Sequence, residues 1–198
     1  TYGFTPTGEL VDLDDAFMIE EARNYGVAPL MHLSTLTEEG GFSNDLAHIA
    51  LNNMEVQERL IQNVIATMGR KNYYSLDVDF EYVFPEDRDA YTAFIQNLRN
   101  RLNPLGYEVT VALAPKTSAN QRGLLYEGHD FRGLGQAANW VLLMTYEWGY
   151  TYGPAMAVSP INKVREVLDY AVTEIDPKKI FLGMPNYGYD WTLPFVQG

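Results

Sequence analysis

The chain of 198 residues is 46% hydrophobic and 20% charged, which is typical of a folded globular protein, and we expect a single domain over residues 1–198. Its net charge of −12 argues against nucleic acid and against an anionic membrane surface as partners. No apolar run approaches the roughly 20 residues of a membrane-spanning helix, so membrane insertion is not expected. The chain contains no cysteine, which excludes disulfides and thiolate metal sites. We expect that any secretion signal has been removed or lies outside this sequence.

Short apolar runs alternate with amphipathic helical patterns along the whole chain. Strands are predicted at 1–4, 26–33, 73–83, 107–115, 139–148 and 179–188. Helices are predicted at 12–25, ending at Gly26, at 56–68, from Pro85 to 102, and at 160–171, with Ser159 as N-cap and Pro160 as the first helical residue. Because hairpin signals are missing, the strands should be parallel and joined by crossovers, as in an open doubly wound sheet or a (β/α)8 barrel. A full barrel takes about 250 residues, so the roughly six units predicted here indicate a smaller open fold or an incomplete barrel.

The stretch SLDVDFEY at 75–82 places three carboxylates at alternating positions of a predicted strand. Side chains alternate in direction along a strand, so Asp77, Asp79 and Glu81 share one face and the apolar residues between them share the other. The apolar set should pack against helices, and the acids should face the barrel axis or a crevice. An unpaired buried carboxylate costs several kcal/mol or takes up a proton, which favours catalysis over an exposed acidic edge. A calcium site is disfavoured because the D-x-D-x-D-G loop pattern is missing.

The three acids have different expected roles. Glu81 is nearest the carboxyl end of the strand, where barrel active sites open, and is the best candidate for a general acid. Asp77 and Asp79 are neighbours on one face, so we expect them to share one proton. Because all three acids lie on one side of a bound sugar, a glycosidase built on them would use the acetamido group of the substrate as nucleophile.

Three motifs resemble those of family 18 glycoside hydrolases, which are (β/α)8 barrels. The segment LDVDFE resembles the D-x-x-D-x-D-x-E signature of the fourth strand, with Asp77, Asp79 and Glu81 in place and Tyr74 at the position of the first acid. The segments LLMTYEW and LGMPNYGYDW resemble the M-x-Y-D and G-x-P-x-Y-G motifs of strands six and seven. The amino-acid sequences of these segments resemble most those of the family branch that contains spore cortex-lytic N-acetylglucosaminidases. The resemblance implies a (β/α)8 TIM barrel present as about strands two to seven and truncated at both ends.

The resemblance also implies roles for individual residues. Glu81, Asp79, Asp77 and Tyr146 would be catalytic, with Glu81 as acid and base, Asp79 orienting the acetamido group and Tyr146 bonding its oxygen. The residues expected to contact substrate are Met144, Glu147, Trp148, Asn186, Tyr187 and Phe4. Loop aromatics such as Tyr150 and Tyr152 could stack on sugars or pack as a lid. The histidines at 32, 48 and 129 lie in unrelated contexts without metal-ligand spacing, so neither a metal nor a cofactor is expected.

The implied activity is the retaining, substrate-assisted hydrolysis of β-linked N-acetylglucosamine bonds in peptidoglycan, with spore cortex as one candidate. A chitinase or chitobiase-like enzyme stays open as an alternative, and so does a carbohydrate-binding barrel without turnover. The expected partner is a polysaccharide, either peptidoglycan or chitin oligomers. The expected location is extracellular, at the cell wall or the spore.

Overall fold

A single parallel sheet forms the centre of the computed structural model, which describes residues 1–37 and 39–194. Its five strands follow one another in chain order: β1 (Leu30–Ser34), β2 (Ser75–Asp79), β3 (Val109–Leu113), β4 (Trp140–Leu143) and β5 (Ile180–Leu182). Tyr2 forms a further parallel bridge to Leu33, so the start of the chain lies beside β1 where a sixth strand would pair. A doubly wound sheet reverses its strand order at a switch point, and this order does not reverse. The sheet therefore has the winding of a (β/α)8 barrel wall, as the sequence predicts.

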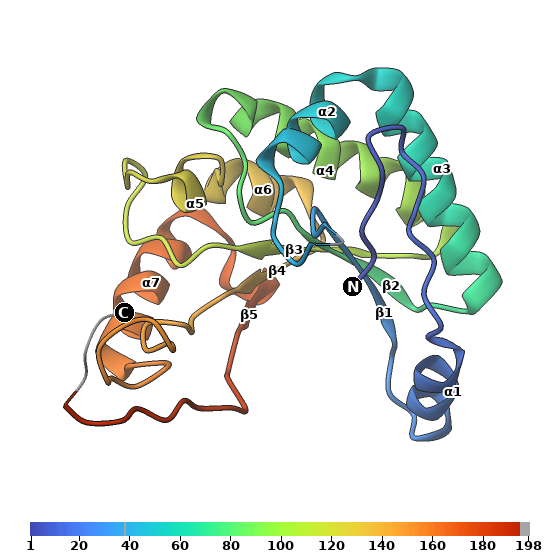
Figure 1. The fold of residues 1–198 in the computed structure, drawn as a ribbon. Helices are drawn as coiled ribbons and strands as arrows, with labels where there is room; N and C mark the ends of the chain where they lie inside the picture. Colours follow the sequence, from blue (N-terminus) through green and yellow to red (C-terminus); the bar gives the residue numbers. More distant parts are fainter. Residues whose placement is uncertain (38, 195–198) are drawn as a thin grey trace.

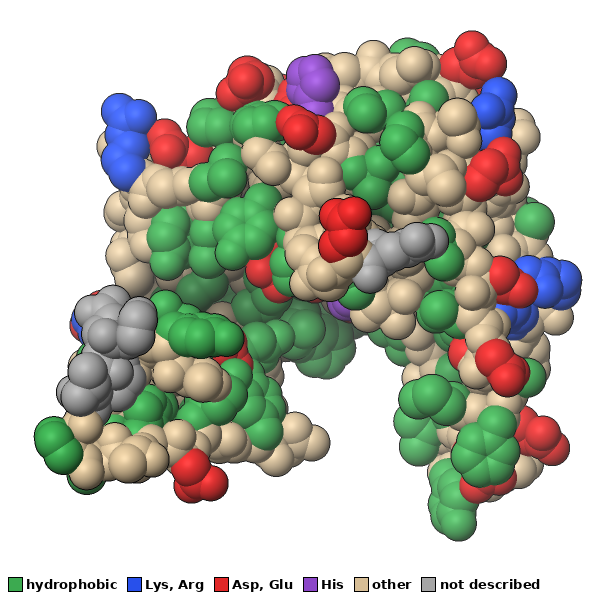
Figure 2. Space-filling model, viewed as in Figure 1, with side chains coloured by type: hydrophobic (Ala, Val, Ile, Leu, Met, Phe, Trp, Pro, Cys, Tyr) green, Lys and Arg blue, Asp and Glu red, His purple; other side chains and the backbone are tan. Residues whose placement is uncertain are grey.

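Helices connect the strands and cover the outer face of the sheet. They are α1 (Ala16–Asn24), α2 (Asn44–Asn52), α3 (Met54–Lys71), α4 (Arg88–Leu102), α5 (Leu124–Glu127), α6 (Phe131–Ala137) and α7 (Ile161–Glu174), with short 3₁₀ turns at Pro85–Asp87, Asn103–Leu105 and Pro177–Lys179. Figure 1 shows α2, α3, α4 and α6 gathered over one face, with α1 and α7 at the two ends of the sheet. On the opposite side the space-filling view is hollowed between two limbs, one at α1 and one at the segment after β5 (Figure 2). Within the described ranges, no helix has the length and hydropathy needed to cross a bilayer.

The two faces of the sheet differ in composition, as strand alternation requires. The residues that face the helices are apolar and fully buried: Met31, Leu33, Leu76, Val78, Val111, Val141 and Leu143. Phe80 continues this face beyond β2, and its ring stacks on Tyr91 and Phe94 of α4 with centroids 5.6 Å apart in both pairs. The prediction that the apolar residues between the acids pack against helices is therefore confirmed.

Several predicted boundaries are corrected by the structure. The strand predicted at 179–188 ends at Leu182, because β5 lies at the sheet edge and pairs with β4 alone among the described strands. Ser159 does not cap α7: its Oγ donates to the Thr145 carbonyl at 2.6 Å, and Pro160 precedes the helix without a side-chain cap. The helix predicted from residue 12 begins only at Ala16, since the preceding residues take part in a polar network.

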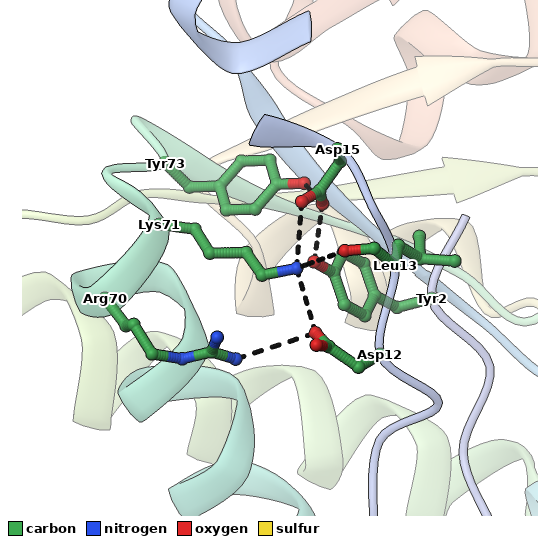
Figure 3. A network of polar contacts seen from close by, with 7 residues as sticks. All are labelled: Tyr2, Asp12, Leu13, Asp15, Arg70, Lys71 and Tyr73. Atoms are coloured by element: carbon green, nitrogen blue, oxygen red, sulfur yellow. Dashed lines mark hydrogen bonds and ion pairs between the residues drawn. The ribbon is translucent and has the colours of Figure 1, made fainter. Parts of the chain in front are cut away.

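That network ties the first fifteen residues to the end of α3 and the start of β2 (Figure 3). The buried Asp15 carboxylate accepts hydrogen bonds from the Tyr2 and Tyr73 hydroxyls and from Lys71 Nζ at 2.8 Å. Lys71 also contacts Asp12 Oδ1 at 2.8 Å. Burial alone would raise the pKa of Asp15, but its bonds to Lys71 and the two tyrosines outweigh burial and lower that pKa to about 2. The N-terminal segment is thus held in place by a charge-assisted cluster at the amino ends of the strands.

Candidate active site

The acids of the SLDVDFEY stretch lie on the inner face and at the carboxyl end of the sheet. Asp77 and Asp79 belong to β2, and their partners in register on β1 are His32 and Ser34, so these four side chains point to the same side. The chain leaves β2 after Asp79 and carries Glu81 two residues further on. Barrel active sites open at this end of the strands, so the position agrees with a catalytic role for the three acids.

A cavity of about 160 Å³ lies at this end, beside Glu81. Its lining comes from the segments that follow β2, β3 and β4: Glu81, Pro115, Leu125, Tyr126, Met144, Tyr146, Glu147 and Trp148. Five of these eight residues were predicted from the sequence as site residues. The carboxyl ends of three consecutive parallel strands therefore bring these side chains, which are up to 67 positions apart, to one place.

The electrostatic surroundings of Glu81 suit a general acid. Burial is the largest influence, and repulsion from the Asp79 and Glu147 carboxylates adds to it; together they raise the pKa of Glu81 to about 7, although His32 acts in the opposite direction. Burial also raises the pKa of the Tyr146 hydroxyl, as do the negative charges of Asp79 and Glu81, so Tyr146 stays a hydrogen-bond donor. A carboxyl group that titrates near neutrality can both give and take a proton at physiological pH.

His32 is a site residue that sequence reasoning missed. Its Nδ1 lies 2.8 Å from Asp77 Oδ2, and its Nε2 lies 3.5 Å from Asp79 Oδ2. Burial alone would lower the pKa of His32, but the contacts with the two carboxylates outweigh burial and raise that pKa to about 9. A signal was present in the sequence: His32 and Ser34 alternate with apolar residues in the strand that precedes the acidic one, so adjacent parallel strands would place them next to the acids.

A second histidine, His129, is hydrogen-bonded to the backbone next to Glu81. It is fully buried, its Nδ1 accepts from the Ala114 amide at 3.0 Å, and its Nε2 bonds the Phe80 carbonyl at 2.9 Å. Burial lowers the pKa of His129 to about 4, so the ring is neutral with its proton on Nε2. His129 therefore joins the segments after β2 and β3 immediately beside Glu81.

Glu147 lies at the cavity wall in an unusual backbone conformation. Its φ of 67° is in the left-handed region, which residues other than glycine seldom adopt. The Glu147 carboxylate accepts hydrogen bonds from the Tyr187 hydroxyl and from the Tyr189 hydroxyl at 2.8 Å. Trp191 Nε1 donates to the Gly153 carbonyl at 3.0 Å. These bonds connect the loop after β4 to the segment after β5.

The other residues predicted to contact substrate lie at different distances from the cavity. Tyr187 reaches the site through Glu147, as described above, whereas Asn186 is exposed at a bend and lies outside the cavity lining. The prediction that Phe4 contacts substrate is wrong: Phe4 is only 4% exposed, and its ring stacks on Phe80 in the core at 5.7 Å. Tyr150 and Tyr152 contact each other edge to face on the loop after β4. Among the described residues, no cluster of three metal-ligating side chains is found.

Comparisons with known proteins agree with this geometry. The chain is 45% identical over 180 residues to the cortical fragment-lytic enzyme of Bacillus subtilis (strain 168), an alignment that covers 91% of this chain and 41% of the relative. The crystal structure of the Bacillus cereus spore cortex-lytic enzyme SleL superposes with a TM-score of 0.95 at 39% identity, covering 100% of this chain and 46% of that one. A chitinase structure from Chromobacterium violaceum has a TM-score of 0.89 at 27% identity, covering 96% of this chain and 60% of that one.

The chain thus spans less than half the length of these cortex-lytic relatives. The profile of glycosyl hydrolases family 18 matches residues 22–194, which is most of the chain. The acids of β2, the sequential parallel strands and this match together show that the chain belongs to glycosyl hydrolase family 18.

Proposed function

We propose that residues 1–198 belong to one catalytic domain that hydrolyses β-linked N-acetylglucosamine bonds in peptidoglycan, with spore cortex as the substrate. The observation that carries the proposal is the environment of Glu81. Its carboxyl group is half-buried, has a pKa of about 7, and lies beside Asp79 at the carboxyl end of the sheet. The likeness to cortical fragment-lytic enzymes supports peptidoglycan as the substrate class. An extracellular, spore-associated location follows from that substrate.

The proposed reaction retains the anomeric configuration through two displacements. Protonated Glu81 gives its proton to the glycosidic oxygen while the acetamido carbonyl oxygen of the substrate attacks the anomeric carbon; the bond between that carbon and the glycosidic oxygen breaks, and the departing sugar leaves with a free hydroxyl. Asp79, supported by Asp77, accepts a hydrogen bond from the acetamido N–H and stabilises the positive charge of the cyclic intermediate. Tyr146 donates to the acetamido oxygen. Glu81 then removes a proton from the water that opens the ring.

The position of Glu147 supports the acetamido group as nucleophile. Glu147 lines the same cavity as Glu81 and is the other carboxylate in its lining. Two tyrosine hydroxyls occupy the Glu147 carboxylate, so it is held as an acceptor rather than free to attack a sugar. A substrate-assisted route needs no second protein carboxylate across the scissile bond.

Replacement of Glu81 by glutamine tests the proposal. In the full protein that contains this chain, Glu81→Gln keeps the shape of the side chain but cannot transfer a proton, so hydrolysis of cortex fragments should fall by about 10²–10⁴-fold. Binding of the fragments should persist, because the amide adds no charge beside a neutral sugar. Glu86→Gln is a matched control, since Glu86 is exposed five residues further along.

The same assay separates the rival functions. Unmutated protein that binds N-acetylglucosamine oligomers without cleaving them would identify a carbohydrate-binding barrel. Faster cleavage of chitin oligomers than of cortex fragments would identify a chitinase, which the similarity to chitinase structures makes the second candidate. Equal cleavage by Glu81→Gln and the unmutated protein would remove Glu81 from the mechanism.

A further inference from the structure

His32 bridges the two aspartates of the site. The β1–β2 register places His32 opposite Asp77 and Ser34 opposite Asp79. Both ring nitrogens of His32 face a carboxylate oxygen, Nδ1 that of Asp77 at 2.8 Å and Nε2 that of Asp79 at 3.5 Å. A neutral imidazole carries one N–H and one lone pair, so it can donate to only one of the two. The Nδ1 contact is a hydrogen bond and the Nε2 contact is at ion-pair distance, so the imidazolium form is favourable to both carboxylates, whereas a neutral ring serves one.

Charge balance in the inner face points the same way. The side chains of Asp77 and Asp79 are only 15% and 11% exposed, so two ionised carboxylates there would repel each other through a medium that screens poorly. A cation between them reduces the net charge of the group from about −2 to about −1. A proton shared by the two aspartates, as expected from the sequence alone, would be another way to reduce the repulsion between them.

The second oxygen of Asp79 has unused hydrogen-bonding capacity. Asp79 Oδ1 is buried and accepts no hydrogen bond from residues 1–37 or 39–194. Its partner Oδ2 faces the His32 ring. A cation that holds an aspartate through one oxygen fixes the carboxylate in place, and the unpaired oxygen leaves that carboxylate with capacity to accept a further N–H.

We propose that His32 is a positioning residue that lies as an imidazolium between Asp77 and Asp79 and fixes the Asp79 carboxylate as the acceptor for the acetamido N–H of the substrate. This role rests on the proposed function. It assigns to the imidazole the proton that the sequence alone would place between the two aspartates.

Other charged groups near His32 are compatible with this role. On its other side His32 lines a second cavity together with Asp14 and Asp15. Asp15 is already paired with Lys71, and the two tyrosines there donate to Asp15 rather than to His32. The carboxylates of β2 are thus the groups that His32 contacts directly, and they outweigh burial in setting its pKa.

The charge of His32 can be measured without any turnover. In ¹⁵N spectra of histidine-labelled full protein at pH 7.5, both His32 nitrogens should show the protonated, imidazolium-type shift. His129 should show one protonated and one unprotonated nitrogen in the same spectrum, and it is an internal reference for the neutral form. A His32 ring that is neutral at pH 7.5 would overturn the proposal.

Kinetics test the positioning role. His32→Gln removes the charge and should lower kcat at least tenfold, equivalent to about 1.4 kcal/mol of transition-state stabilisation, with a smaller change in KM. Because the charge of His32 lowers the pKa of Glu81, its loss should also move the alkaline limb of the pH–rate profile to higher pH. His32→Lys restores a cation and should recover part of kcat and return the limb toward its original position.

A matched control exists in the same chain. His48 pairs with the buried Asp87 at 2.7 Å but lies on α2, outside the cavity lining, so His48→Gln should leave kcat and the limb unchanged. A His32→Gln variant with the kcat and pH limb of the unmutated protein would overturn the proposal, and so would a failure of His32→Lys to restore either one. If the unmutated protein does not cleave, the proposed function fails, while the ¹⁵N spectrum still decides the charge of His32. The spectrum also decides it if His32→Gln does not fold.

Discussion

The high-pH side of the activity profile should be set by Glu81. In the proposed mechanism protonated Glu81 is the general acid, and its pKa of about 7 means that about nine tenths of the molecules carry this proton at pH 6 and about one tenth at pH 8. The pKa is raised above the ordinary value of 4.5, so the active form is lost as the pH rises through 7. We therefore expect kcat/KM to fall tenfold per pH unit above about pH 7.5, where the deprotonated form dominates.

Glu147→Gln tests whether neighbouring negative charges set the position of the alkaline limb of the pH–rate profile. The change removes one of the two negative charges that raise the pKa of Glu81, and it keeps an acceptor oxygen for Tyr187 and Tyr189. Burial is the larger influence on Glu81 and stays, so the limb should move to lower pH by about half a unit to one unit rather than to the value of a free carboxyl group.

The measurement is a pH series of kcat/KM on soluble cortex fragments, with the folded state checked by circular dichroism at each pH. Glu86→Gln removes a charge of the same sign from an exposed position and should leave the limb in place. A limb that does not move in Glu147→Gln, or that moves to higher pH, would refute the assignment of the alkaline limb to Glu81.

Two further predictions concern support for the site and for the fold. Lys71→Met leaves the buried Asp15 carboxylate without its cation, so the free energy of unfolding, measured in urea, should fall by about 3 kcal/mol; a loss within experimental error would contradict the stabilising role of the network. Gly183→Ala would place a Cβ 2.6 Å from the Leu143 carbonyl oxygen and 2.7 Å from the Tyr146 ring, so the end of β4 or Tyr146 must shift and kcat should fall at least tenfold, whereas Gly188→Ala, with no atom within 4 Å of its Cβ, should be neutral. Equal kcat values for the two alanine variants would show that activity does not depend on the close packing of Gly183 against Leu143 and Tyr146.

The sequence predicts best what depends on local alternation. Asp77, Asp79 and Glu81 fall on one face because strand side chains alternate, and no distant contact is needed to see it. The parallel sheet follows equally from the order of elements. Strand ends are predicted less well: the run at 179–188 is apolar enough for a long strand, but at the sheet edge one neighbour supports only Ile180–Leu182.

Contacts between distant segments explain the failures. His32 and Asp77 are 45 positions apart and meet only because their strands pair in one particular register. The tyrosine pair on Glu147 depends on where the segment after β5 crosses the loop after β4. Phe4 could face either side of its segment, and its stacking on Phe80 decides the matter in favour of the core. Alternation along the chain can place His32 on the inner face of its strand, but it does not show which residues of other segments these side chains meet.

The bonds between the loop after β4 and the segment after β5 bear on how this site could diversify. The acids of β2 are spaced by strand geometry, about 6.6 Å for every two residues, so the chemistry is insulated from changes in loop sequence. The loops themselves are not independent, since Glu147 is bonded to Tyr187 and Tyr189, and Gly153 is bonded to Trp191. If only one of the two segments were replaced by that of a relative with a different substrate, the residues of the segment left in place would lose their hydrogen-bonding partners. A change of substrate range should therefore require that the loop after β4 and the segment after β5 change together, both in evolution and in engineered variants.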